Sequence, residues 1–233
     1  MTAAADDVRH NLAAQRARLV AACRAAGRPD DAAALLAVSK THPADAVRAA
    51  YAAGQRAFGE NRVQELAAKA RELADLPGLQ WHVIGSLQTN KVRDLLAVPG
   101  LALVHSLDRS KLGDELQREC ARQGRALDVL LQVHATDEPT KHGCPPEQAA
   151  ALLDHVCARC PALAVVGLMA MGPLAGDPAP TFAAVAALRD RLRAATGLPL
   201  PTLSLGMSGD LEPAVAAGST MVRIGTAVFG ARG

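Results

Sequence analysis

Short apolar runs alternate with longer amphipathic stretches along nearly the whole chain, and this alternation restricts its possible folds more than any other feature. The longer stretches repeat apolar residues with a helical period, for example over residues 61–76, 108–123, 147–160 and 180–195. The short runs lie at residues 35–39, 57–59, 79–85, 101–106, 128–134, 164–170, 202–206 and 221–226. Strand-like runs that alternate with helices predict consecutive βα units and a parallel sheet.

The number of runs selects among the parallel-sheet folds. Eight βα units in about 200 residues predict a compact (β/α)8 TIM barrel, and runs that are apolar on both faces suit buried parallel strands. An open doubly wound sheet is the alternative, but six strands are more usual there and no G-x-G-x-x-G follows any run. No linker divides the chain, so we expect one domain over residues 1–233. An extra helix over residues 4–26, ended by Gly27 and Pro29, precedes the first run.

Composition excludes several classes of partner. The 25 Lys and Arg residues nearly balance the 23 Asp and Glu residues, and three Phe, one Trp and one Tyr leave little for stacking on bases. No stretch approaches the roughly 18 apolar residues of a membrane span, and the N-terminus lacks the features of a secretory signal. Five cysteines, an odd number, do not indicate a disulfide framework. We therefore expect a cytoplasmic protein that binds neither nucleic acid nor membrane.

Lys40 is the most informative single residue. It follows the run 35–39 directly, so in a barrel it lies where strands end and functional groups gather. Partial desolvation there disfavours the ammonium and makes an amine available for Schiff-base chemistry. The alternative is a lysine that extends its ammonium into solvent at a strand end.

Two glycine-containing turns near the end of the chain form the second feature. One spans residues 203–210 and the other residues 224–226, after the seventh and eighth runs. The loops after strands 7 and 8 are the common phosphate site of such barrels, because glycines let backbone N–H groups approach a phosphate and Ser and Thr hydroxyls add donors. The alternative is two turns that simply require glycine.

If Lys40 holds a pyridoxal ring and the two loops hold its phosphate, Arg223 is placed to face the ring nitrogen, where a guanidinium opposes protonation and makes the ring a poorer electron sink.

The other signals are weaker. His82 either points into the barrel or packs in it. Cys157 and Cys160, near His155, resemble half a metal or redox site, but buried structural cysteines are the better interpretation, and we predict no metal site.

Six blocks of sequence resemble the pyridoxal-phosphate homeostasis protein family. They are AVSKT at 37–41, FGEN at 58–61, WHVIGSLQTNK at 81–91, GLMA at 167–170, LSLGMS at 203–208 and RIGTAVFG at 223–230. They occur in the family's order, and the resemblance covers roughly residues 8–232. It implies a barrel similar to the N-terminal domain of alanine racemase, classed with the fold type III pyridoxal-phosphate proteins.

The resemblance also implies roles for individual residues. Lys40 holds pyridoxal 5′-phosphate as a Schiff base and Arg223 faces the pyridine nitrogen. The remaining cofactor contacts fall to the phosphate ligands Ser208, Gly225 and Thr226, to Ser204, Gly206 and Met207 in the same loop, and to Asn61 near the ring. No catalytic residue is implied. The sequence departs from the family at Arg62, where Tyr is frequent, and at His134, where Asn is usual, whereas Glu138 and Lys141 match.

The implied function is intracellular pyridoxal-phosphate homeostasis, as a cofactor carrier or regulator without established turnover. The expected partners are the cofactor and pyridoxal-phosphate-requiring apoenzymes, and the expected state is a monomer or weak dimer. The alternative is a racemase-like enzyme of low activity. Such an enzyme needs an acid/base group opposite the lysine, which alanine racemase takes from a Tyr in a C-terminal domain; here the chain ends at Gly233 and Tyr51 lies far from any strand end.

Two further chemical possibilities follow from the residues. General acid/base work could fall to His82 or His134. A lysine-dependent aldolase without cofactor would account for Lys40, but it leaves Arg223 and the glycine turns without a task.

Overall fold

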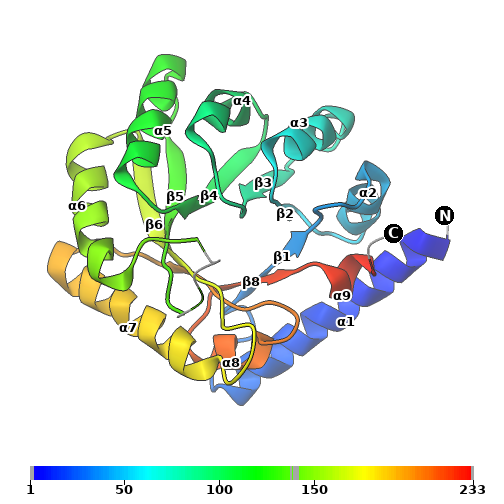
Figure 1. The fold of residues 1–233 in the computed structure, drawn as a ribbon. Coiled ribbons are helices and arrows are strands. Elements are labelled where there is room, and N and C mark those ends of the chain that lie inside the picture. Colours follow the sequence, from blue (N-terminus) through cyan, green and yellow to red (C-terminus); the bar gives the residue numbers. More distant parts are fainter. Residues whose placement is uncertain (1–2, 137, 139–141, 232–233) are drawn as a thin grey trace.

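The sheet is a closed barrel of eight parallel strands in chain order, and β8 pairs with β1 to close it (Figure 1). The computed structural model describes residues 3–136, 138 and 142–231, so Lys141 lies outside the described residues. The strands are β1 Ala34–Val38, β2 Ala57–Glu60, β3 Gln80–Val83, β4 Leu101–Leu107, β5 Leu127–Gln132, β6 Leu163–Met169, β7 Thr202–Ser204 and β8 Met221–Ile224. The predicted (β/α)8 barrel is confirmed.

Helices surround the barrel on its outside (Figure 1). They are α1 Ala3–Ala25, α2 Ala44–Ala52, α3 Val63–Glu72, α4 Val92–Leu96, α5 Ser110–Gln123, α6 Ala149–Arg159, α7 Ala179–Thr196, α8 Leu211–Ala216 and α9 Thr226–Phe229, with 3-10 turns at Thr89–Lys91 and Pro146–Gln148. Within the described residues, none of these helices is both long enough and apolar enough to cross a membrane.

Several predicted strands extend past the point where the sheet ends. The runs 79–85, 128–134 and 202–206 each continue two residues beyond β3, β5 and β7. Apolar and small residues continue from the strand into the loop, so hydropathy does not mark the last ladder hydrogen bond. After β7 the chain turns at Gly206, whose φ of +90° takes it out of the extended conformation.

The N-terminal helix α1 covers the seam where the first and last strands meet. It packs against α2, α8 and α9 (Figure 1) and ends at Ala25; two residues later Gly27 has a φ of +66°, the left-handed conformation that glycine favours. After the helix, Arg28 Nη1 donates to the carbonyl oxygens of Val215 (2.7 Å) and Ser219 (2.8 Å). The expected extra helix therefore joins the two ends of the barrel.

Most of the core lies between the outer face of the sheet and the helices. Inside the barrel a small apolar cluster contains Leu103, Leu130 and Met169. The barrel interior also holds buried polar side chains, among them His82, His105, Ser204 and Arg223. Buried polar groups need hydrogen-bond partners, so these four side chains are candidates for a functional site at the carboxyl ends of the strands.

Candidate functional site

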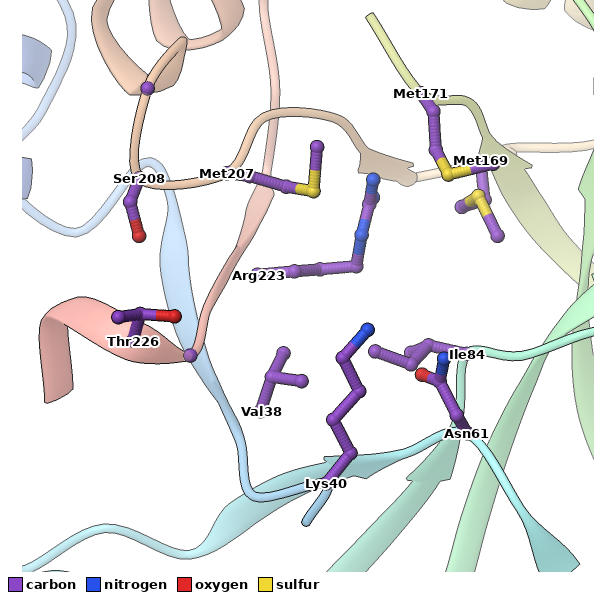
Figure 2. A pocket seen from close by; sticks show the side chains of 12 residues that line it. Val38, Lys40, Asn61, Ile84, Met169, Met171, Met207, Ser208, Arg223 and Thr226 are labelled. Carbon is purple, nitrogen blue, oxygen red and sulfur yellow. The ribbon is translucent and has the colours of Figure 1, made fainter. Parts of the chain in front are cut away.

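A cavity of about 340 Å³ opens at the carboxyl ends of the strands (Figure 2). Its lining residues come from six of the eight strand ends and are Val38, Lys40, Asn61, Ile84, Met169, Met171, Met207, Ser208, Gly209, Arg223, Gly225 and Thr226. Seven of the nine residues that the sequence singled out are among them, and Ser204 and Gly206 are not. The volume lies in the range of small-molecule sites.

Lys40 follows β1 and is half-buried. Figure 2 shows its side chain extending into the cavity beside Asn61 and Ile84, and Val38 adds a second apolar wall. A primary amine that lines a cavity can act as a nucleophile toward a bound carbonyl compound. The position suits covalent chemistry with a carbonyl compound.

Arg223 lies on β8 and is buried inside the barrel. Its Nη1 donates to the carbonyl oxygen (2.6 Å) and to Oγ (2.8 Å) of Ser204, and its Nη2 donates to the carbonyl oxygen of Ala170 (3.0 Å). Burial lowers the pKa of Arg223 to about 10, an effect that Asp210 opposes. The guanidinium is therefore still protonated at neutral pH and places a positive charge at the cavity wall.

A chain of hydrogen bonds continues from Arg223 across the barrel interior. Ser204 Oγ lies 3.1 Å from His105 Nδ1, and His105 Nε2 lies 2.9 Å from His82 Nδ1. Burial lowers the pKa of His82 to about 4 and lowers the pKa of His105 well below its usual range, so both rings are neutral at pH 7. His82 thus faces the barrel interior. The sequence reasoning missed His105, which the two-residue alternation from Leu103 places on the inner face.

Ser208, Gly225 and Thr226 line one side of the cavity, and Figure 2 shows both hydroxyl side chains on that side. A Cβ at Gly225 would lie 3.2 Å from the carbonyl oxygen of Val38, so the turn packs closely on β1. Hydroxyls beside a turn without side chains are typical of phosphate binding.

Gly206 and Ser204 shape the site from behind the cavity wall. A Cβ at Gly206 would lie 2.5 Å from Cβ of Ala214, and the Gly206 carbonyl accepts a hydrogen bond from the Arg223 backbone N–H (3.0 Å). Ser204 is buried and holds the guanidinium. Both residues act through Arg223 and the turn.

The departures from the family pattern lie outside the cavity lining. Arg62 is exposed at the start of α3. His134 is half-buried, and its buried Nε2 has no hydrogen-bond partner among the described residues. Tyr51 lies on α2, where its hydroxyl donates to the carbonyl oxygen of Pro77 (2.9 Å). None of these side chains offers an acid or base to the cavity.

The interpretation of Cys157 and Cys160 as two buried cysteines is wrong for Cys157, which is exposed on α6. Cys160 is buried after the end of that helix, because the helical turn separates the directions of the two side chains. Ligand atoms of Asp114, His155 and Cys160 lie within 4.8 Å of one another, and His155 Nε2 lies 2.7 Å from Asp114 Oδ1. None of them lines the cavity.

Comparison with known proteins identifies relatives of the whole chain. The sequence model of the alanine racemase N-terminal domain family matches residues 5–233. A pyridoxal phosphate homeostasis protein from Pseudomonas aeruginosa is 47% identical over 225 residues, which are 97% of this chain and 96% of that protein.

Solved structures agree with this assignment. PipY of Synechococcus elongatus without PLP has a TM-score of 0.85 at 40% identity, and PipY with PLP bound has a TM-score of 0.83 at 39% identity; each match covers 96% of this chain and 100% of the other. Alanine racemase from Corynebacterium glutamicum (TM-score 0.71, 18% identity, 97% of this chain and 61% of that chain) shares the fold. The chain belongs to the alanine racemase N-terminal domain family and, within it, to the pyridoxal phosphate homeostasis proteins.

Proposed function

We propose that this protein binds pyridoxal 5′-phosphate in the cavity, holds it as a Schiff base on Lys40, and acts as a carrier or regulator in homeostasis of that cofactor. One observation carries the proposal: an amine, a buried cation and two hydroxyls surround the same cavity, from Lys40, Arg223, Ser208 and Thr226. The pyridoxal phosphate bound by PipY, whose fold this chain shares at 39% identity, supports the same ligand.

The donor set suits each part of this ligand. Pyridoxal phosphate supplies an aldehyde, with which a primary amine condenses as a C=N bond replaces C=O and the oxygen leaves as water. Lys40 provides an amine that lines the cavity, and Arg223 provides a cation that suits an unprotonated ring nitrogen. Ser208 and Thr226 provide hydroxyl donors for the phosphate beside the turn at Gly225.

The cavity favours a carrier over an efficient amino-acid racemase. Among the described residues that line it, only Lys40 and Arg223 have side chains that ionise as acids or bases. A racemase needs a second proton-transfer group opposite the lysine, and neither His82 nor His134 lines the cavity. The Arg223 cation also disfavours a protonated pyridine, which is the better electron sink. We infer that amino-acid turnover lies far below the ~1–1000 per second of typical enzymes.

The partners and cellular location form the finer part of the proposal. We propose a cytoplasmic location, and the balance of 25 basic and 23 acidic residues supports a protein without a nucleic-acid or membrane partner. We propose pyridoxal-phosphate-requiring apoenzymes as recipients of the cofactor and a monomer or weak dimer as the working state.

Replacement of Lys40 by Ala tests the covalent attachment. The reconstituted protein is reduced with borohydride, and peptides are examined by mass spectrometry. We expect a pyridoxyl group on Lys40 of the wild-type protein and none in Lys40→Ala. Lys111→Ala, which removes an exposed lysine of α5, is the matched control and keeps the adduct. A main adduct on another lysine of the wild-type protein contradicts the assignment.

A further inference from the structure

A second lysine, Lys69 on α3, lies buried close to the strand end that carries Lys40. Its side chain is 7% exposed, and its Nζ donates three hydrogen bonds: to Glu60 Oε1 (2.6 Å), to Glu65 Oε1 (2.8 Å) and to the carbonyl oxygen of Ser39 (2.6 Å). An ammonium group has three protons to donate. Every donor of Lys69 is therefore used in this arrangement.

Both chain neighbours of Lys40 are tied to this network. Ser39 Oγ donates to Glu60 Oε1 (2.6 Å), while the backbone N–H of Thr41 donates to Glu65 Oε1 (2.6 Å). Because Lys69 bonds to both carboxylates and to the Ser39 carbonyl, one side chain connects the backbone before Lys40 with the backbone after it.

The backbone at Thr41 needs such support. Thr41 has a φ of 67°, in the left-handed region that β-branched residues rarely adopt. A conformation of this kind is strained and persists only where the surroundings stabilise it. The His42 backbone N–H closes the turn by donating to the Ser39 carbonyl oxygen (3.1 Å), and the Glu65 carboxylate supports it by accepting the Thr41 N–H.

The network is better suited to setting geometry than to adding stability. The Glu60 side chain is fully buried, and burial raises the pKa of its carboxyl while the hydrogen bonds from Lys69 and Ser39 oppose the rise. A buried ion pair gains little stability over apolar residues of similar volume, because both ions lose their hydration. Its hydrogen bonds nevertheless fix the position of every group that takes part.

We propose that Lys69 is a positioning residue for Lys40, which it acts on through Glu60, Glu65 and the backbone of Ser39 and Thr41. The inference rests on the proposed function of Lys40 and concerns only the amine. Lys69 does not line the cavity and so has no direct contact to offer the pyridine ring or the phosphate. Loss of Lys69 therefore affects attachment of the aldehyde more than binding of the rest of the ligand.

The test separates attachment from binding with two probes. The first is the rate constant at which pyridoxal phosphate forms a borohydride-reducible adduct with Lys40. The second is the affinity for 4′-deoxypyridoxine 5′-phosphate, which keeps the ring and phosphate but has no aldehyde. In Lys69→Met we expect the rate constant to fall about 10- to 100-fold, as displacement of a reacting group does. The affinity for the analogue stays within about a factor of two.

Two further variants complete the experiment. Lys111→Met makes the same substitution at an exposed lysine of α5 and leaves both probes unchanged. Lys69→Met leaves the Glu60 carboxylate buried without its cation, which threatens folding. If Lys69→Met does not fold, Glu65→Ala replaces it in the experiment. Glu65 is 26% exposed and accepts hydrogen bonds from Lys69 and from the Thr41 backbone N–H, so its removal leaves the contacts of Glu60 with Lys69 and Ser39 in place. Its loss lowers the rate constant and leaves the affinity for the analogue unchanged.

Each remaining outcome rejects a defined statement. Equal losses in rate constant and analogue affinity mean that Lys69 only maintains the shape of the pocket, which overturns the inference. An unchanged rate constant in Lys69→Met, or in Glu65→Ala where that variant stands in, overturns it as well. If the wild-type protein itself forms no reducible adduct at Lys40, the proposed function fails instead.

Discussion

At the scale of single residues, the hydroxyls of Ser208 and Thr226 are the proposed phosphate contacts, and they are distinct from the groups proposed to contact the ring and the aldehyde. Figure 2 shows their hydroxyls on one side of the cavity, apart from the lining side chains of Lys40 and Arg223. Recognition of the phosphate is therefore separable from recognition of the ring and aldehyde, and substitutions at the two hydroxyls affect one part of the ligand.

We expect Ser208→Ala and Thr226→Val each to weaken binding of pyridoxal phosphate much more than binding of pyridoxal. A hydrogen bond to a charged group is worth about 1.5–3 kcal/mol, or roughly ten- to a hundredfold in the dissociation constant. Titration of each variant with both ligands measures this difference. Ser208→Thr keeps a hydroxyl and is the control. Equal losses for the two ligands would show that these hydroxyls do not contact the phosphate.

At the scale of secondary-structure elements, α1 supports the turn that carries Ser208. Arg18 donates from Nε and Nη2 to the two carboxylate oxygens of Glu212 on α8 (2.7 and 2.6 Å) and from Nη1 to the carbonyl oxygen of Ser208 (2.8 Å). A helix outside the barrel repeat thus reaches the backbone of the proposed phosphate site. Support of this kind holds the Ser208 hydroxyl in place before a ligand arrives.

Removal of this contact predicts a loss of phosphate affinity. In Arg18→Ala the dissociation constant for pyridoxal phosphate rises about two- to tenfold, the equivalent of one ordinary hydrogen bond. Arg24→Ala is a matched control on the same helix, since Arg24 makes the same two-oxygen contact with Asp30 and no contact with the turn. Isothermal titration of both variants with pyridoxal phosphate measures the two dissociation constants. Equal dissociation constants for Arg18→Ala and Arg24→Ala would contradict the role given to α1.

At the scale of the whole molecule, the barrel interior makes stability depend on pH. His82 and His105 are buried and neutral, since burial lowers the pKa of both rings, that of His82 to about 4. In the unfolded chain a histidine takes up a proton near its ordinary pKa of 6.5. Between those values the unfolded state binds more protons than the folded state, so protonation favours unfolding as the pH falls.

The free energy of unfolding is therefore expected to fall as the pH drops from about 6.5 toward about 4, and to be independent of these two groups above that window. Each histidine contributes up to about 1.4 kcal/mol per pH unit. Urea unfolding is measured at a series of pH values for the wild-type protein and for His82→Gln. The difference between the two isolates the contribution of His82 from that of the carboxylates. We expect a shallower pH dependence in the variant, and parallel curves would contradict the assignment.

The sequence alone determined that the chain forms a barrel and which residues make up most of its candidate site. Eight apolar runs alternating with helices predict parallel strands, and parallel strands bring all their carboxyl ends to one edge. Lys40 and Ser208 follow such runs, Thr226 ends one and Arg223 lies within it, so their meeting at one cavity could be predicted without distances. Strand ends were predicted less well, because apolar residues continue into the loops after β3 and β5.

Only the tertiary structure decided which side chains touch one another. Three hydrogen-bonded pairs join residues that are far apart in the sequence. The sequence separations are 99 residues for His105 and Ser204, 30 for Lys69 and Ser39, and 190 for Arg18 and the Ser208 carbonyl. Such contacts depend on strand register, on the inward or outward direction of each side chain and on the packing of α1 over the seam. Local sequence patterns carry the periodicity of each element but not the spacing between elements, which barrel closure and packing establish together.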